Sequence, residues 1–438
     1  MPTSAERFPP GAVSARATRG RRVVRHLFGL GWLLWLGAGT LSAQEALRNS
    51  LAGEASARAR KAAENIPYNL KVGPATLRVS SGLAVNYIDN INVGSTNVLE
   101  DLILRPDVSI DAFWPVTPQN TLNFSVGVGY SKYVKSATND SLSIRPNSAI
   151  SFDVFIGDFK INLHDRFSYV QDPLQNGAVS GTNAAAAGFG TSQNAVGVAV
   201  DWDLNKILLT VGLDHQDSFS TSSTYSYLDQ TSEFFYVRPS MVLNPVVSVG
   251  LDLAGGISSY NQSGALSNSR HYSAGPFVNW KISEHMNVSL RGGYVLYSFD
   301  SSTGRTNALN TAGSYANLTL DHLLSKYISH SISAGYQISA GVSSDAQQLT
   351  FIRDTAIWRI VRNATVNTDI FYEHSDEIRS LQIQPEAYSR YGFSVATSYL
   401  LTLKMNVGLA YSYTHKTSNL IGHDYTQNSV TLSATYRF

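Results

Sequence analysis

Histidine, serine and acidic side chains are the residues of this sequence that could carry out catalysis. His164 is followed by Asp165, and His215 and His271 stand among many serines. A nucleophilic serine works only when a histidine and an acid are held against it in space, and spacing along the chain does not supply that geometry. With ten histidines in the chain, chance proximity is expected. We therefore predict that the protein is not an enzyme, with a lipase or protease as the alternative.

Residues that could hold a metal, a cofactor or a nucleic acid do not occur at the required spacing. The chain has no cysteine, which excludes disulfides and thiolate metal sites. No metal-ligand spacing and no glycine-rich phosphate-binding loop stands out. The net charge is +1, and no basic stripe indicates nucleic-acid binding. We predict no metal, no cofactor and no nucleic-acid partner.

Arginine and aspartate form the largest set of candidate functional residues. They recur on the polar side of segments in which polar and apolar residues alternate. The basic members are Arg78, Arg105, Arg145, Lys160, Arg166, Arg238, Arg291, Arg353, Arg359 and Arg390. The acidic members are Asp107, Asp111, Asp153, Asp201, Asp214, Asp252, Asp321, Asp369 and Glu373. Because the two sets nearly balance, we predict charge pairs on a hydrated surface with weak net ion selectivity. A basic ladder for an anionic solute is the alternative, since the sequence does not say whether the arginines gather on one wall.

The segments that carry these charges have the alternation of β-strands. Near the carboxyl terminus Val430, Leu432 and Ala434 share one face, while Ser429 and Thr431 share the other. Successive side chains of a strand point to opposite sides, so each such segment has one apolar and one polar face. Eighteen segments show this pattern: 76–87, 100–114, 121–134, 142–156, 159–170, 193–204, 206–217, 231–243, 246–258, 269–282, 286–299, 314–325, 328–342, 347–361, 363–374, 387–401, 403–415 and 426–438.

The connections between these segments alternate in length. Short turns such as 157–158 follow every second strand, and longer links such as 171–192 lie between them. Short periplasmic turns and longer extracellular loops are typical of outer-membrane barrels. This pattern places both termini in the periplasm, which requires an even number of strands, and eighteen is even.

The composition agrees with a barrel. Charged residues make up 15% of the chain, against about 25% in a soluble domain. No segment after residue 43 has 18 consecutive apolar residues, which excludes membrane helices. We predict an all-β fold: a transmembrane antiparallel up-and-down β-barrel of about 18 strands, formed by residues 76–438 and integral to a bacterial outer membrane. A soluble β-propeller is the alternative.

Aromatic residues mark two expected membrane interfaces. Four tryptophans adjoin short turns: Trp114, Trp202, Trp280 and Trp358. Aromatic girdles belong at the edges of the lipid-facing band. A set of tyrosines near the long links is expected to form the opposite girdle: Tyr87, Tyr130, Tyr133, Tyr169, Tyr297, Tyr372 and Tyr413.

The amino terminus has the features of a secretory signal. Arginines between Arg16 and Arg25 precede a short apolar core at 27–36, and small residues lead to Ala43. This predicts a signal peptide at 1–43, which is too short for a membrane helix. Residues 44–75 are predicted to form a periplasmic segment with a short helix in its first part, 44–65. That helix is a plain tail, a small plug or a docking element for a periplasmic partner.

Three tripeptides echo one another: Leu-Arg-Pro at 104–106, Ile-Arg-Pro at 144–146 and Val-Arg-Pro at 237–239. Each opens a strand after a long link, and the first strand ends in Tyr-Ile-Asp-Asn-Ile at 87–91. This layout resembles the β-barrel porin type 2 family of outer-membrane proteins. The resemblance implies a conduit for polysaccharide export and a periplasmic polysaccharide-export protein as partner. The terminal Tyr436 and Phe438 resemble the signal read by the barrel assembly machinery.

An eighteen-stranded barrel leaves room for an aqueous channel. We predict an outer-membrane channel, surrounded by outer-membrane lipids, that exports polysaccharide; a passive diffusion porin and a plugged structural or adhesive barrel are the alternatives. Four aromatic residues fall on the lumen face and either stack sugar rings or pack against other parts of the chain: Tyr236, Phe277, Tyr315 and Phe371. The apolar loop 171–192 either folds inward as a constriction or stays at the surface.

Overall fold

The computed structural model describes residues 68–170, 190–262, 266–300, 310–339, 344–380 and 384–438. The strands of these ranges are β1 (Leu70–Val72), β2 (Ala75–Ile88), β3 (Asp101–Pro115), β4 (Thr121–Tyr133), β5 (Ser141–Ile156), β6 (Phe159–Val170), β7 (Thr191–Asp203), β8 (Ile207–Ser220), β9 (Gln230–Asn244), β10 (Val247–Tyr260), β11 (Ser269–Ser283), β12 (Met286–Phe299), β13 (Thr311–Ser325), β14 (Ile328–Ser339), β15 (Ser344–Val361), β16 (Ala364–Ser380), β17 (Ala387–Leu400), β18 (Met405–Ser418) and β19 (Tyr425–Arg437). Two 3-10 helices are η2 (Ala137–Asn139) and η4 (Ser223–Leu228). No helix in the described ranges is long and apolar enough to cross a membrane.

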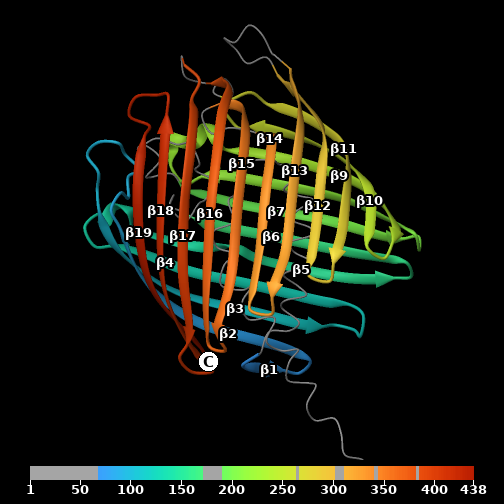
Figure 1. The fold of residues 1–438 in the computed structure, drawn as a ribbon, viewed down its shortest axis with the longest axis horizontal. Coiled ribbons are helices and arrows are strands. Elements are labelled where there is room, and N and C mark those ends of the chain that lie inside the picture. The colour runs from blue at the N-terminus through green and yellow to red at the C-terminus, as the bar shows by residue number, and fades with distance from the viewer. Residues whose placement is uncertain (1–67, 171–189, 263–265, 301–309, 340–343, 381–383) are drawn as a thin grey trace, which may run out of the picture.

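The strands β2 to β19 form one closed antiparallel barrel. Each strand pairs with its neighbour in the sequence, and β19 pairs with β2, with Thr431 opposite Asn86. Figure 1 shows the strands following one another round the ring at a steep tilt. Closure leaves no free sheet edge, so every strand has a hydrogen-bonding partner on both sides. The predicted eighteen-stranded up-and-down barrel is therefore confirmed.

The observed strand ends differ from the predicted ones by three residues or fewer, with one exception. The segment predicted at 363–374 continues to Ser380, because its end pairs with the start of β15, where Ser344 lies opposite Ser380. Polar residues occupy both faces of this extension. The alternation of polar and apolar residues that predicts a membrane strand therefore stops near residue 374, although the strand continues to Ser380.

A short strand also lies in the segment predicted to be a periplasmic tail. In β1, Leu70 pairs with Leu77 of β2, next to the point where β19 ends with Arg437 opposite Ser80. β1 thus occupies the part of the β2 edge that the last strand does not reach. The signal peptide at 1–43, the helix at 44–65 and nearly all of the loop 171–192 lie outside the described residues.

The outer face of the barrel is apolar. On β3, Leu102, Leu104 and Val108 are exposed, while the alternating residues Asp101 and Ile103 are buried. The same alternation of exposed apolar residues recurs round the ring. A continuous exposed apolar surface of this kind is not stable in water and forms the lipid-facing band of outer-membrane barrels. The chain is therefore an integral outer-membrane barrel.

Tryptophans mark one edge of this band. The four of them, next to short turns, are 37–49% exposed: Trp114, Trp202, Trp280 and Trp358. Phe159 stacks on Trp202 with ring centroids 5.3 Å apart. The opposite girdle differs from the prediction, because Tyr133 and Tyr297 are only 2% and 5% exposed. Each lies an odd number of residues from an exposed tyrosine on its strand, Tyr130 or Tyr294, so the alternation turns it inward.

The ends of the barrel differ. Short turns join strands at the tryptophan edge, and two of them use the left-handed backbone conformation, at Gly157 (φ 56°) and Asn205 (φ 74°). Glycine and asparagine adopt this conformation more readily than other residues. Figure 1 shows β1 and the carboxyl terminus together at this same end.

The Tyr-Ile-Asp-Asn-Ile segment fastens the first strand to the last at the opposite end. The Asp89 carboxylate accepts hydrogen bonds from the backbone N–H (2.7 Å) and the side-chain amide (2.6 Å) of Asn428. The buried Asn90 amide donates to the backbone carbonyls of Thr426 and Gly94, both at 2.9 Å. The motif is therefore a closure clamp that continues the β2–β19 seam beyond its last ladder pair.

We expect Asn90→Ala to loosen this clamp. The change leaves buried backbone groups without partners, which costs about 1–3 kcal/mol. The temperature at which the folded band converts to the unfolded band on a detergent gel should fall. Asn92→Ala is the matched control, since Asn92 bonds only to Asn97 and Leu99 within its own loop; an equal fall in both variants would contradict the clamp.

Candidate functional site

The candidate site is the inner wall of the barrel, and strand alternation decides which side chains reach it. On β3, Arg105 and Asp107 lie between the outward-facing Leu104 and Val108. The same alternation places the other predicted lumen residues on the inner face: Arg145, Arg166, Arg238, Arg291, Arg353, Asp153, Asp252 and Asp369.

Most of these charges are paired with an opposite charge on a nearby strand. Arg353 Nε lies 2.9 Å from Asp369 Oδ1, and Arg390 Nε lies 2.8 Å from Glu373 Oε1. Further pairs are Arg78 with Asp111, Arg145 with Asp107, and Lys160 with Asp153. An arginine held by a carboxylate offers little net charge to a passing ion, so the wall is polar without being strongly basic.

Three of the contacts cross an intervening strand, and a glycine makes two of these crossings possible. His164 Nε2 of β6 lies 2.6 Å from Asp214 Oδ1 of β8, and a Cβ on Gly197 of β7 would overlap both side chains. A Cβ on Gly127 of β4 would likewise overlap Arg145, which crosses β4 to Asp107. A side chain at either glycine would separate the partners, so glycine is required there for space rather than for backbone conformation.

The third crossing contact joins three charges. Asp252 of β10 lies 3.4 Å from Arg238 of β9 and 3.6 Å from Arg291 of β12. The position opposite Asp252 on β11 is Gly275, where a Cβ would overlap the backbone of Gly292 and Gly293 on β12. All three charged side chains are less than 10% exposed. Removing one partner of a buried pair costs about 3–5 kcal/mol, so this group also holds the wall together.

Phenylalanine rings separate the arginines in two places. Phe277 has the guanidinium carbons of Arg238 and Arg291 at 6.0 and 5.7 Å from its ring centre. Phe371 has those of Arg353 and Arg390 at 5.6 and 5.3 Å. Cations over an aromatic face contribute about 0.5–2 kcal/mol.

These rings leave little surface for a sugar. Phe277 is 4% exposed, and Tyr236 and Tyr315 are also buried. Gly250 lies opposite Phe277, and Gly392 lies opposite Phe371, which makes room for the rings. Packing against the wall is therefore the better account of these aromatic residues than a stacking surface.

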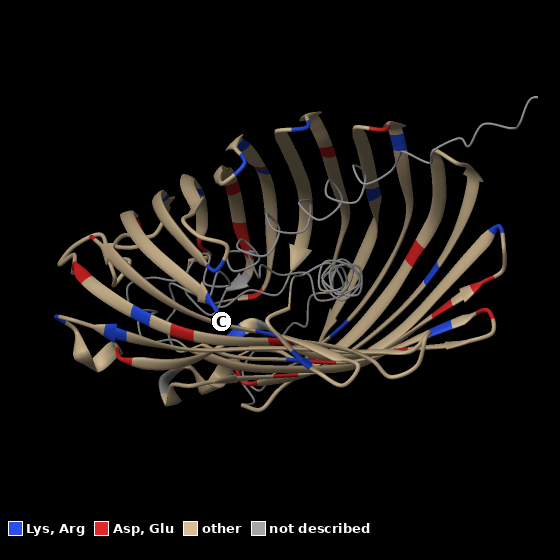
Figure 2. Ribbon diagram, turned by 90° about the horizontal axis from the view of Figure 1, so that it is seen from below, with Lys and Arg blue, Asp and Glu red and all other residues tan. Residues whose placement is uncertain are grey.

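The charges are spread round the barrel. Figure 2 shows basic and acidic positions interleaved round the ring of strands, with no side of the ring carrying charges of one sign only.

Charges are also paired at the mouth opposite the tryptophans. Hydrogen bonding from Lys132 lowers the pKa of Asp140, and hydrogen bonding from Lys135 lowers the pKa of Glu100. Both carboxyls are therefore ionised at neutral pH and neutralised by lysine.

The inner face is covered in the half of the barrel away from the tryptophans. The backbone N–H of Ser267, before β11, donates to Asp345 Oδ1 of β15 at 2.8 Å, although β12, β13 and β14 lie between these strands. Ser344, Asp345 and Ala346 are buried although they alternate in direction, so both faces of the tip of β15 are covered. A buried apolar cluster lies on the wall beside it: Val295, Tyr297, Phe299, Tyr315, Ile338 and Ala346. Residues 266–268, just before β11, and the tip of β15 thus narrow the lumen.

The histidines considered for catalysis are not arranged for it. His164 is held by Asp214 and Asn162, and His271 is buried between Phe234 and Tyr297. His215 lies on the outer face, where Glu233 contacts it. None of these contacts involves a serine hydroxyl.

A serine–histidine–acid chain that the sequence analysis did not single out lies at the rim, on β16 and β17. His374 Nδ1 is 3.0 Å from Ser389 Oγ, and its Nε2 is 3.4 Å from Asp376. The histidine and aspartate side chains are about half exposed to the surroundings. The second contact is long and nothing encloses the chain, so it does not form a preorganised catalytic site.

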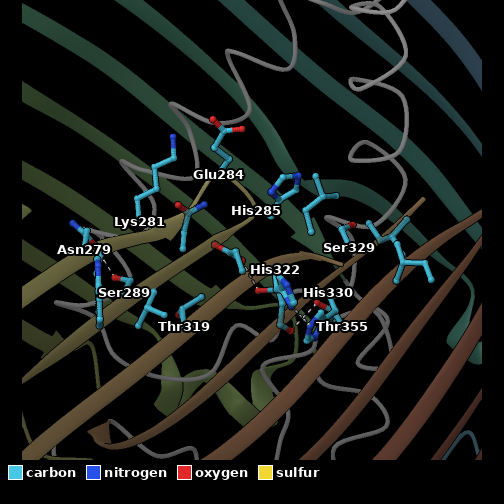
Figure 3. A pocket seen from close by; sticks show the side chains of 18 of the residues that line it. Asn279, Lys281, Glu284, His285, Ser289, Thr319, His322, Ser329, His330 and Thr355 are labelled. Carbon is cyan, nitrogen blue, oxygen red and sulfur yellow. Dashed lines mark hydrogen bonds between the residues drawn. The ribbon is translucent and has the colours of Figure 1, made fainter. Parts of the chain in front are cut away.

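A cavity of about 1100 Å³ lies near the tryptophan end, between β10 and β16. Figure 3 shows its polar side chains, among them Asn279, Thr319 and Thr355. His322 and His330 also border it, with ring nitrogens 3.2 Å apart. In the described parts of the chain no cluster of three or more histidine and acidic residues has the geometry of a metal site.

Comparison with known proteins gives only distant similarity. No protein-family model and no curated protein matches the sequence. Among solved structures, OpdQ of Pseudomonas aeruginosa is similar over 83% of this chain and 99% of its own, with 11% identity and a TM-score of 0.47. OccK8 (OprE) of the same organism covers 83% and 98%, with 14% identity and a TM-score of 0.46. OccAB3 of Acinetobacter baumannii covers 83% and 99%, with 10% identity and a TM-score of 0.45. Similarity at this level identifies neither a family nor a solute.

We expect the charged group around Asp252 to set ion preference by its net charge. In planar bilayers under a KCl gradient, Arg238→Gln should shift the reversal potential toward cations and Asp252→Asn toward anions. Each change in permeability ratio should be about two-fold, or roughly 0.4 kcal/mol, because these charges act through a hydrated lumen. The double variant with Arg238→Gln and Asp252→Asn should have a reversal potential close to that of the parent protein.

Lys404→Gln, in the turn between β17 and β18, is the control that removes a charge away from the wall. If neither Arg238→Gln nor Asp252→Asn changed the reversal potential relative to the parent protein, the charged group would lie outside the ion path.

Proposed function

We propose that this protein is a passive, weakly selective channel for small hydrophilic solutes across the bacterial outer membrane, with both termini in the periplasm. The observation that carries the proposal is the inner wall, where polar residues are plentiful and their charges are neutralised in pairs. Barrels of 16–18 strands are wide enough for water. A wall without excess charge selects solutes by their size more than by the sign of their charge.

The orientation is supported by the connections. Short turns, β1 and Phe438 lie at the tryptophan end, and outer-membrane barrels have their short turns in the periplasm. Tyr436 and Phe438 end the last strand there, with ring centroids 5.4 Å apart. We propose, as the sequence predicts, that these two residues are read by the barrel assembly machinery during insertion among outer-membrane lipids.

Small solutes are favoured over a polymer because of the narrowing on the far side from the tryptophans. The Ser267–Asp345 contact holds the chain just before β11 against β15. The rings beside it are buried, so the described residues there offer no run of exposed aromatic surface for a sugar chain. Polysaccharide export, with a periplasmic export partner, stays a prediction of the sequence resemblance that no contact of the described residues favours.

The purified full-length chain should form open channels. In planar bilayers we expect a steady conductance proportional to voltage and a cation-to-anion permeability ratio near one, since the wall charges cancel. The measurement is single-channel current in KCl, with a heat-denatured sample as control. A barrel that inserts but passes no current would indicate the plugged structural alternative.

Deletion of the gene should separate solute uptake from polymer export. We expect slower growth on limiting small hydrophilic nutrients and unchanged surface and secreted polysaccharide, both relative to the complemented strain. The measurements are growth rate and polymer quantification on the same cultures. A collapse of surface polymer with periplasmic accumulation would replace the diffusion channel with the export conduit.

A further inference from the structure

Two histidines face each other on neighbouring strands near the tryptophan edge of the barrel. His322 of β13 lies directly opposite His330 of β14 in the ladder, and both are labelled in Figure 3. Their ring centroids are 5.3 Å apart, and His322 Nδ1 lies 3.2 Å from His330 Nε2. Side chains that are directly opposite each other in an antiparallel pair point to the same face of the sheet. The two rings therefore lie together on one face of the barrel wall.

That face is the outer one. Alternation along β13 groups His322 with Leu318 and Leu324, which are 40% and 56% exposed on the lipid-facing side. His330 is two residues from the position opposite Trp358. At the usual strand rise and tilt, two residues correspond to a height of about 5 Å. The histidine pair thus lies at the edge of the lipid-facing band, where ions can reach it from the water.

The spacing of the two ring nitrogens suits a shared metal ion. Imidazole nitrogen binds Zn²⁺ at about 2.0–2.1 Å, so two nitrogens on one tetrahedral ion are about 3.3 Å apart. The observed separation is 3.2 Å. An ion would sit to one side of the line between the nitrogens, which requires the rings to turn about their side-chain bonds but does not require the strands to move. The ladder therefore holds the pair ready to act as two ligands of a single ion.

A carboxylate determines which ring nitrogen His330 presents. Asp354 Oδ1 of β15 lies 3.5 Å from His330 Nδ1. The same oxygen is buried and accepts no hydrogen bond within the described part of the chain. A proton on Nδ1 faces this carboxylate, which leaves the lone pair of Nε2 directed at His322. A carboxylate behind a ligating imidazole fixes the tautomer of the imidazole in this way.

Asp354 also gives an electrostatic reason for a cation at this place. Its side chain is 46% exposed. It shares the outer face with Ile352 of its own strand and with Ile370, which lies opposite it on β16; these two are 50% and 59% exposed. An ionised carboxylate among lipid-facing residues is costly unless a positive charge is close to it. Neutral His330 does not provide that charge, and a divalent ion held by the two histidines does.

We propose that His322 and His330 bind one divalent transition-metal ion of the class that imidazole ligands favour, Zn²⁺ or Cu²⁺, with Asp354 as the residue that positions His330. The site offers two protein ligands, and water completes the coordination of the ion. Two ligands rather than three agree with the absence of a three-residue metal cluster from the described strands. The ion is therefore exchangeable, and its site is separate from the channel on the inner wall.

Titration with Cu²⁺ of the full-length protein, purified without a histidine tag, tests the site, because electron paramagnetic resonance counts the nitrogens bound to this ion. The variants His322→Gln and His330→Gln each remove one ligand and keep a polar side chain. His415→Gln is the matched control, since His415 also lies on the outer face but contacts the hydroxyls of Thr417 and Thr426. Each variant is first shown to be folded by its heat-dependent gel shift.

We expect one Cu²⁺ per chain, bound by two imidazole nitrogens, in the parent protein and in His415→Gln. The two-nitrogen signal should be absent from His322→Gln and from His330→Gln, and calorimetric titration with Zn²⁺ should show the same loss of binding. Asp354→Asn should weaken Zn²⁺ binding about ten-fold, while the two-nitrogen signal persists at saturating Cu²⁺, because this residue positions a ligand without being one.

Three results would overturn the metal site. A parent protein that binds no ion, or binds it through one nitrogen, would leave the pair as a plain hydrogen bond between two imidazoles. Binding that survives His322→Gln would place the ion elsewhere on the protein. Equal loss in His415→Gln would show adventitious binding that depends only on the number of histidines. Unchanged Zn²⁺ affinity in Asp354→Asn would overturn the positioning role of that residue.

Discussion

The rest of the structure depends on the pairing of β19 with β2. A strand in a lipid bilayer cannot leave backbone N–H and C=O groups unpaired, because no water is present to bond them. Closure removes the free edges, fixes the even number of strands, and separates an inner face from an outer one. Asp89 and Asn90 continue the same seam beyond its last ladder pair, and β1 occupies the remaining edge of β2 at the other end. The channel wall exists only because this seam is complete.

Once the ring is closed, the inner wall is organised by short-range electrostatics. Asp107 and Asp214 each reach a basic or imidazole partner across a strand that carries glycine at the crossing, and Asp252 reaches Arg291 across β11. This arrangement ties next-but-one strands together and neutralises the wall at the same time. Stability of the wall and weak ion selectivity are therefore consequences of the same contacts.

The outer face is stabilised differently from the inner wall, because most of its side chains are apolar. Apolar side chains need no partner in lipid, so most of the band is satisfied by the membrane itself. Some outward side chains of β6 to β9 are polar, and there Asn194 donates to Asp165 and His215 contacts Glu233. The barrel thus has one surface for lipid and one for water.

The sequence by itself determined the barrel, because residue alternation and turn spacing are local signals: Val430, Leu432 and Ala434 predict their face without knowledge of any partner. It also determined that Arg238 and Asp252 face inward. The pairing of Asp252 with Arg291 was decided only by tertiary structure, since the two residues belong to β10 and β12 and meet across the strand between them. Tyr133 was misplaced for a related reason, since aromatic character predicts an interface but strand direction decides the side. The extension of β16 to Ser380 depends on its pairing with the start of β15, and the Ser267–Asp345 contact joins residues 78 positions apart, so the alternation of residues within one segment predicts neither.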